Sequence, residues 1–249
     1  MIRISAISYL NSLPFAWCLE HSAIMDEIEL SYDIPSQCAD KLIAGEADIG
    51  LIPIVEILRM PEHYIVSDLC IGADNEVRTV ILASETPLTD ISTVYLDHHS
   101  RTSVVLAKIL AKHYWKIEPE WKHFSGDITS YPRNGNSAAV VIGDKTFGLQ
   151  LPHIYDLAVE WRKFTGLPFV FACWVANKPL DEGFLSRFNE AMNGLFDKMN
   201  AIVEHYKGQA PTGVDLFDYW TNNISYPLTT DKRKGLELFL QYAGEILKK

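Results

Sequence analysis

Short apolar runs alternate with amphipathic stretches along the first third of the chain, a pattern typical of strands followed by helices. The apolar runs favour strands in the first half of 4–15 and at 27–33, 48–53, 64–71 and 77–84. The amphipathic stretches favour helices at 13–20, from Ser36 to 44 before Gly45, and from Pro53 to 58. Because helical crossovers join most of these strands, we expect a parallel core.

A second α/β unit begins near residue 87. Its pattern predicts strands at 93–97, 121–124 and 138–142, and helices at 104–114 and 161–164. An extended run at 169–176 then precedes helices at 181–206, 217–220 and 233–247. This order predicts an α/β protein of two lobes, 1–86 with 174–249 and 87–173, with a small-molecule cleft between them.

A polar turn follows the first predicted strand and precedes the first predicted helix. It carries Ser8, Tyr9, Asn11 and Ser12, and Pro14 fits the first turn of the helix. In an open α/β sheet such a turn lies at the carboxyl edge, where ligands bind, and the helix N-terminus favours an anion. An ordinary capped turn explains the same residues equally well, since caps are common.

A second polar turn repeats this arrangement after the strand at 93–97. Ser100, Thr102 and Ser103 precede a helix, where hydroxyl and N–H groups can hold a carboxylate or phosphate. Arg101 can add a charge-assisted bond or point to solvent. Ser100 alone can be explained as a helix cap. Two such turns, one on each predicted lobe, favour a shared anion site.

Three further candidates lie at strand ends. Gly143 and Asp144 follow the strand at 138–142, and Asp144 can bind a ligand hydroxyl, orient a neighbour or act as a base. Gly-Asp is equally good turn chemistry. Ser84 ends the strand at 77–84, and we include it with Gly143 among the candidate substrate-binding residues.

Two adjacent histidines in the second turn are candidate acid/base groups. Histidine side chains ordinarily titrate near physiological pH, which makes His98 and His99 candidates, although such a pair is more often one exposed and one packed residue. With Asp97 they suggest a metal, but other ligands lack the required spacing, so no metal is expected. The chain contains no HExxH, GxSxG or Walker motif, and no GxGxxG after a strand.

Composition and charge restrict the possible partners. The 249-residue chain is 48% hydrophobic and 22% charged, with a net charge of -10, which argues against nonspecific binding to nucleic acid or an acidic membrane. Its four cysteines form no CxxC pair and are expected to be buried thiols. With no secretory signal and no apolar run of about 20 residues, we expect a cytoplasmic protein.

Several motifs together resemble those of the chorismate dehydratase family. They are SYLNSLPF at 8–15, ADIGLIP at 47–53, SRTS at 100–103, IGD at 142–144 and WRKFTGLPFVFA at 161–172. The resemblance implies a two-lobed fold like type II periplasmic binding proteins, with an interlobe cleft. It also implies a cofactor-free hydro-lyase that converts chorismate to 3-[(1-carboxyvinyl)oxy]benzoate and water in the futalosine route to menaquinone.

The implied substrate is a small dicarboxylate, which agrees with two anion-binding turns. We expect Ser100, Thr102 and Ser103 to hold one carboxylate, while Asn11 and Ser12 position the reacting face. Neither turn offers an obvious base. The proton can pass to the substrate's own enolpyruvyl carboxylate, or to Asp144 or His98.

Other functions compete with this interpretation. A non-catalytic anion-binding protein of the same fold has a similar cleft. The sister enzyme that forms 1,4-dihydroxy-6-naphthoate has an aspartate-rich opening turn, where this chain has Tyr9 to Ser12. A DNA-binding effector domain is disfavoured by the acidic charge and by the lack of a helix-turn-helix pattern.

Overall fold

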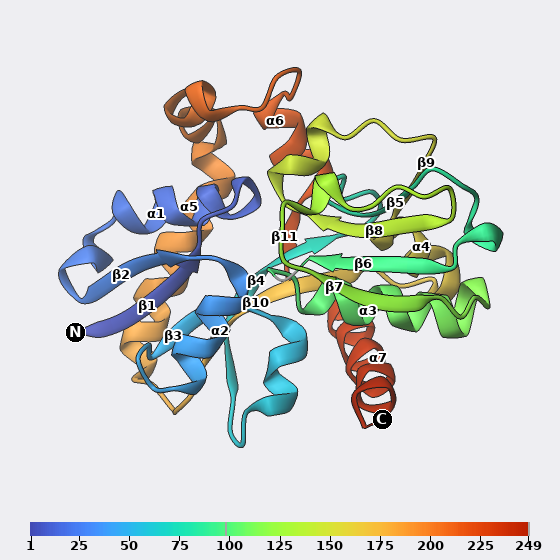
Figure 1. Cartoon of the computed structure of the whole chain (residues 1–249). Helices are drawn as coiled ribbons and strands as arrows, with labels where there is room; N and C mark the ends of the chain where they lie inside the picture. The colour runs from blue at the N-terminus through green and yellow to red at the C-terminus, as the bar shows by residue number, and fades with distance from the viewer. Residues whose placement is uncertain (98, 249) are drawn as a thin grey trace.

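Two mixed β-sheets lie side by side in the computed structural model, which describes residues 1–97 and 99–248 (Figure 1). The first sheet has the strand order β11-β4-β10-β3-β1-β2. Its strands are β1 Ile2–Ile7, β2 Ile28–Asp33, β3 Ile49–Pro53, β4 Tyr64–Ala73, β10 Phe169–Ala176 and β11 Ser225–Pro227. β1 pairs in parallel with β2 and β3, as predicted, whereas β10 runs antiparallel to β3 and β4.

The second sheet has the order β7-β6-β8-β5-β9. Its strands are β5 Val80–Ser84, β6 Thr93–Asp97, β7 Glu120–Phe124, β8 Ser137–Ile142 and β9 His153–Asp156. β6 pairs in parallel with β7 and β8, and β5 runs antiparallel to β8 and β9. The carboxyl ends of β1 and β6 therefore both lead into polar turns.

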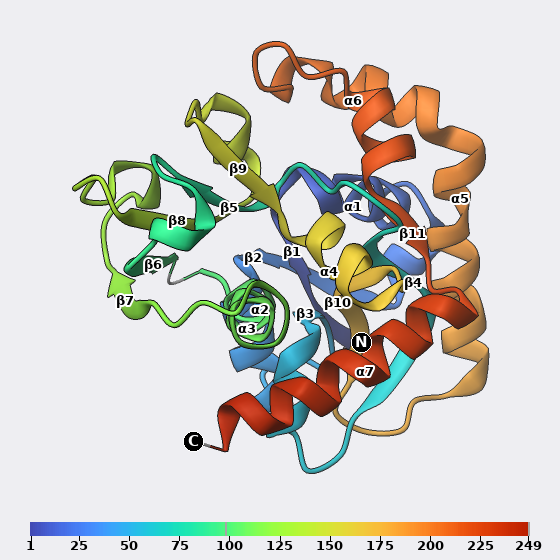
Figure 2. The same cartoon turned by 90° about the vertical axis from the view of Figure 1, so that its right-hand side faces the viewer.

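Seven α-helices surround the sheets within the described residues. They are α1 Leu13–Glu20, α2 Pro35–Ile43, α3 Thr102–Leu110, α4 Leu157–Thr165, α5 Glu182–Tyr206, α6 Leu216–Asp218 and α7 Thr230–Leu247. α7 packs against both α3 and β10, so it spans the two halves of the molecule (Figure 2). Pro35 opens α2 one residue before the predicted Ser36 cap, and Gly45 ends the turn after it with a φ of 73°.

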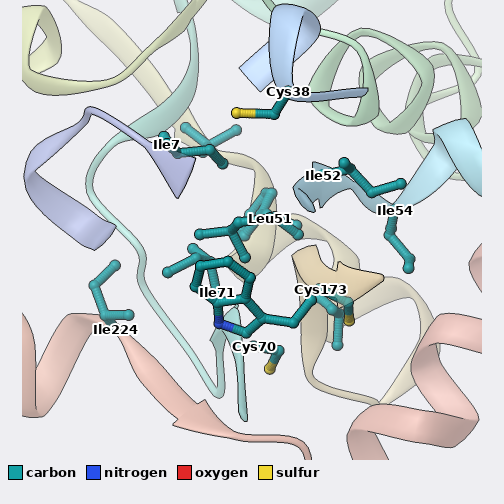
Figure 3. Close-up of a cluster of buried hydrophobic side chains, with 14 of the residues drawn as sticks. Ile7, Cys38, Leu51, Ile52, Ile54, Cys70, Ile71, Cys173 and Ile224 are labelled. Carbon is teal, nitrogen blue, oxygen red and sulfur yellow. The ribbon is translucent and has the colours of Figure 1, made fainter. Parts of the chain in front are cut away.

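The main core fills the space around the first sheet. Ile7, Leu51, Ile71 and Cys173 meet there with side chains from both ends of the chain (Figure 3). All four cysteines are buried and free, which confirms the prediction of buried thiols. Burial raises the pKa of the Cys18 thiol to about 11 and that of Cys38 to about 12, so both stay protonated near neutral pH.

The chain crosses between the sheets at 74–79 and at 157–168. The boundaries expected from sequence, 86/87 and 173/174, are corrected because β5 lies in the second sheet and all of β10 in the first. A buried apolar strand looks the same in either sheet, since its membership depends on long-range pairing. The strands β9 and β11 were also missed, and both are short.

Candidate active site

A small cavity lies between the two polar turns. Its walls come from both sheets: Tyr9 and Asn11 follow β1, the residues from His99 to Ser103 follow β6, and Gly143 follows β8. The remaining lining is largely apolar and consists of Ile7, Pro35, Pro53, Ile71, Thr79, Val80, Ile142, Phe171 and Ala172. An apolar cavity with a few convergent polar groups is the usual form of a small-molecule site.

The first turn, residues 8–12, is held by hydrogen bonds that leave one side chain open. The Ser12 hydroxyl lies 2.6 Å from the Ile7 carbonyl and 2.8 Å from that of Tyr9, so it closes the turn and does not cap α1. Asn11 lines the cavity, and its buried Oδ1 has no hydrogen-bond partner within residues 1–97 and 99–248. A buried amide oxygen without a partner is costly, so it points to a ligand that supplies one.

Tyr9 connects the two walls of the cavity. Its hydroxyl lies 3.1 Å from Nδ1 of His99, and burial, followed by the nearby Asp97 and Asp144 carboxylates, raises the pKa of the phenol well above its usual range. The Tyr9 ring lies against Gly143, where an added Cβ would come within 3.2 Å of the ring. Gly143 also has a φ of 75°, so both its conformation and its contact favour glycine.

The second turn, described over residues 99–103, presents a buried hydroxyl beside the start of α3. Arg101, not Ser100, occupies the N-cap position, and no side chain caps the helix. Ser100 Oγ is buried and, in the part of the chain that the structure describes, has no hydrogen-bond partner. Thr102 Oγ1 accepts from the Val55 N–H at 3.3 Å, which ties this turn to the first sheet.

The charges beside the second turn are largely paired. Arg101 lines the cavity but also lies 3.6 Å from the Asp40 carboxylate. Lys145 pairs with the buried Asp97 carboxylate, which also accepts from the His99 N–H at 3.0 Å. An anion in the cavity would therefore be held mainly by hydroxyl and N–H groups at the start of α3, with Arg101 at the rim.

Asp144 lies beside the cavity and is not among its lining residues. Its carboxylate accepts from the Leu10 N–H, at 3.3 Å and 3.4 Å to the two oxygens. Burial raises the pKa of Asp144, and this hydrogen bond partly opposes the rise. The residue therefore joins the second sheet to the first turn, which differs from the role of a base in contact with a ligand.

Several predicted residues lie away from the cavity. Ser8 is exposed and its hydroxyl donates to the Asp33 carbonyl. The Ser12 hydroxyl is hydrogen-bonded within the first turn. Ser84 lies at the end of β5 opposite the cavity, where its hydroxyl donates to the Ser137 carbonyl at 3.1 Å. Because β5 runs antiparallel to β8, its carboxyl end lies away from Gly143, and the structure does not bring Ser84 to the cavity. His98 lies outside the described residues.

Sequence reasoning missed the C-terminal residues that support the first turn. Trp220 Nε1 donates to the Leu10 carbonyl at 2.8 Å, and the Tyr226 hydroxyl donates to the Asn11 carbonyl at 3.0 Å. These contacts join positions more than 200 residues apart. Nothing in the local sequence around Trp220 and Tyr226 indicated these hydrogen bonds.

No group of three or more His, Cys, Asp or Glu side chains suited to a metal occurs among the residues with described positions. In the same residues, none of the helices combines the length and the apolar character that crossing a bilayer requires.

Known proteins similar to this chain agree on its family. A family model described as menaquinone biosynthesis matches residues 2–245. A chorismate dehydratase from Thermus thermophilus is 22% identical over 258 residues, covering 95% of this chain and 93% of the relative. A chorismate dehydratase from Campylobacter jejuni is 25% identical over 245 residues, covering 94% of each.

Solved structures agree on the fold. Protein AF1704 from Archaeoglobus fulgidus superposes with a TM-score of 0.75 at 14% identity, covering 100% of this chain and 98% of the other. The periplasmic aliphatic sulphonate binding protein SsuA from Escherichia coli does so with 0.60 at 17% identity, covering 99% and 91%. The predicted periplasmic-binding-protein-like fold and the family resemblance are both confirmed. The chain belongs to the menaquinone biosynthesis family whose model spans residues 2–245.

Proposed function

We propose that this protein is a chorismate dehydratase, a carbon–oxygen lyase of the futalosine route to menaquinone. The observation that carries the proposal is a pair of buried polar atoms without partners in the described chain, Asn11 Oδ1 and Ser100 Oγ, on two walls of one cavity. A small molecule with polar groups at both ends would supply the missing partners. Chorismate has two carboxylates and a ring hydroxyl.

The proposed reaction is an elimination that makes the ring aromatic. The C–H bond at the ether-bearing ring carbon breaks and its electrons form a new ring double bond. The neighbouring C–O bond breaks, and the released hydroxide takes up a proton to become water. Aromatisation supplies the driving force, so the protein needs mainly to orient the substrate and to favour this elimination over competing rearrangement.

The polar residues divide these tasks between the two turns. Ser100, with the first N–H groups of α3 at Thr102 and Ser103, holds a carboxylate. Asn11 contacts the reacting face, where its amide can accept from and donate to the leaving hydroxyl. Tyr9 bounds the cavity between them and keeps water away from the ring.

The proton acceptor is the substrate's own enolpyruvyl carboxylate. The lining residues within the described ranges include no Asp or Glu, which favours this assignment over a carboxylate from the protein. Asp144 is already engaged by the Leu10 N–H. His98 remains the alternative acceptor from the protein. Four buried free thiols fit a reducing compartment, and we place the reaction in the cytoplasm.

Incubation of the purified protein with chorismate tests the function directly. We expect a new aromatic product, 3-[(1-carboxyvinyl)oxy]benzoate, detected by proton NMR and by mass loss of one water. Chorismate incubated without the protein serves as the control for uncatalysed decay. Binding of chorismate without a product would favour a non-catalytic binding protein. Turnover of the cyclic futalosine substrate instead would favour the naphthoate-forming sister enzyme.

A further inference from the structure

A short C-terminal segment, residues 219–226, lies along the boundary between the two sheets. It begins directly after α6, forms one wide turn over Tyr219–Asn223 and ends in β11, which pairs with β4 at the edge of the first sheet. In Figure 1, α6 lies at the top of the molecule and β11 lies between the strands of the two sheets. None of its residues lines the cavity, but they contact two segments that do.

One side of this segment holds the backbone of the first turn. Trp220 and Tyr226 are 1% and 2% exposed, and their polar atoms donate to the carbonyls of Leu10 and Asn11. The Asn11 carbonyl is therefore fixed from behind while its side chain faces the cavity. Removing the Tyr226 hydroxyl would take this donor from the Asn11 carbonyl, whereas the Leu10 carbonyl would keep the Leu13 N–H if Trp220 were removed.

The other side of the segment holds the crossing at 74–79. The hydroxyls of Tyr219 and Thr79 lie 2.8 Å apart, and Asn223 Nδ2 donates to the Glu76 carbonyl at 3.2 Å. Ser225 Oγ donates to the Asp74 carboxylate at 2.7 Å. The segment thus contacts the beginning, middle and end of one connection between the sheets.

This crossing is itself part of the cavity wall. Thr79 lines the cavity, and its carbonyl accepts from the Gly143 N–H at 2.9 Å. Gly143 in turn supports the ring of Tyr9. A displacement of the crossing would therefore move Gly143 and, through its contact, the Tyr9 ring. It would also act on the first turn through residues 219–226.

A buried lysine anchors the segment. Lys232 is 0% exposed, and its Nζ donates to the carbonyls of Ser225 and Pro227 and contacts the Ser225 hydroxyl, at 2.6 to 2.8 Å. These bonds fix β11 on α7, which also packs against α3. The segment is consequently a rigid support with contacts on both sides.

We propose that residues 219–226 form a coupling clamp that sets the position of Asn11 according to the position of the crossing at 74–79. Tyr226 and Trp220 are positioning residues that act through the carbonyls of the first turn, and Tyr219 is the contact to the crossing. The kinetic part of this inference rests on the proposed function, because it takes Asn11 as catalytic. The mechanical part, which links the clamp to the turn, does not.

The test is a double-mutant cycle between the clamp and Asn11. Tyr226→Phe removes the donor to the Asn11 carbonyl and keeps the ring, and we expect kcat on chorismate to fall about tenfold with KM little changed. In the Asn11→Ala background the same change should have no further effect on kcat, because the side chain that it positions is gone. Tyr64→Phe, at an exposed position that starts β4, is the matched control.

A second variant keeps the test valid if Tyr226→Phe folds poorly. Tyr219→Phe loses the contact to Thr79, and we again expect a fall in kcat of about tenfold that disappears in the Asn11→Ala background. An equal loss in both backgrounds would mean that the clamp only stabilises the fold, and no loss in the wild-type background would also overturn the proposal.

Hydrogen exchange separates this inference from the proposed function. Without any ligand, Tyr226→Phe should speed exchange of the N–H groups at 10–12, whereas Tyr64→Phe should not. If the wild-type protein leaves chorismate unchanged, the proposed function fails, and this exchange result alone decides the clamp. Unchanged exchange at 10–12 would refute it.

Discussion

The first and second turns have the same local pattern, a strand followed by small polar residues and a helix, but they use their serines in opposite ways. In the first turn, the Ser12 hydroxyl is hydrogen-bonded to the carbonyls of Ile7 and Tyr9. In the second turn, the buried Ser100 hydroxyl has no partner among the described residues. Neither serine caps its helix. A serine after a strand therefore becomes informative only when the carbonyls around it are known.

The same contrast applies to what each turn offers a ligand. The first turn is fixed through its carbonyls by Trp220 and Tyr226, and it exposes a single amide, that of Asn11, to the cavity. The second turn offers a hydroxyl together with the start of α3. We interpret the first turn as the one that acts on the reacting bond and the second as the one that holds charge.

The largest expected effect is that of Asn11→Ala on turnover. If the first turn acts on the leaving hydroxyl, kcat should fall about a hundredfold or more, a loss typical of removing one polar group that stabilises a transition state. Affinity for the product should change much less. The comparison needs steady-state kinetics together with calorimetric titration of the product.

The matched control for Asn11→Ala is Asn193→Ala, the same change on an exposed face of α5. It should leave both turnover and affinity as in the wild type. A wild-type rate for Asn11→Ala would remove this residue from the mechanism. Equal losses of affinity and turnover would mean that both turns only bind.

The next effect in size is the loss of affinity in Ser100→Ala. A hydrogen bond from this hydroxyl to a carboxylate contributes about 1.5–3 kcal/mol, so product binding should weaken about ten- to a hundredfold. The free energy of unfolding should hardly change, since the hydroxyl has no partner in the described chain. Calorimetric titration and urea unfolding measure the two quantities. Normal affinity would show that the carboxylate lies elsewhere.

Ser12→Ala should give the reverse result. The carbonyl that its hydroxyl satisfies is buried in the turn, so unfolding should become easier by about 1–3 kcal/mol. Ligand affinity should stay within a few-fold of the wild type in the molecules that remain folded. The pair of serine variants therefore tests the central contrast, and it fails if both variants lose affinity without losing stability.

Local patterns predicted the elements of the fold better than their assembly. The periodicity placed α1, β3 and β10 within a residue or so of their observed bounds. Membership of β5 in the second sheet depends on its pairing with β8 and β9, which no local pattern contains. For that reason the sequence pattern did not show that Ser84 lies away from the cavity.

The candidate site was partly predictable for a similar reason. The sequence pattern pointed to Tyr9, Asn11 and Ser100, which line the cavity. A polar residue directly after a strand lies at the carboxyl edge of its sheet, and this can be read from the local sequence. Which of them is free to bind depends on neighbours far along the chain. The support from Trp220 and Tyr226 arises only when the C-terminal segment returns to the first turn.

The smallest expected effect is that of Asp144→Asn, which asks whether Asp144 is a base or a structural tie between the second sheet and the first turn. The variant keeps an oxygen that can accept from the Leu10 N–H but cannot take up a proton as a base. If Asp144 is a tie, kcat should stay within a few-fold of the wild type. Asp144→Ala should cost more, because the Leu10 N–H then loses its acceptor. A collapse of kcat in Asp144→Asn, with affinity retained, would instead assign Asp144 as the base.

The pH dependence of stability gives a second reading of Asp144. Burial raises its pKa in the folded protein above the ordinary value of 3.8, so folding favours the protonated carboxyl. Its contribution to stability is then fully present below about pH 3.8 and is lost as the pH rises through the folded pKa. Asp144→Asn should therefore gain stability relative to the wild type as the pH rises through that window, as urea unfolding at several pH values can measure. The opposite slope would mean that the Leu10 N–H outweighs burial and holds this carboxylate ionised.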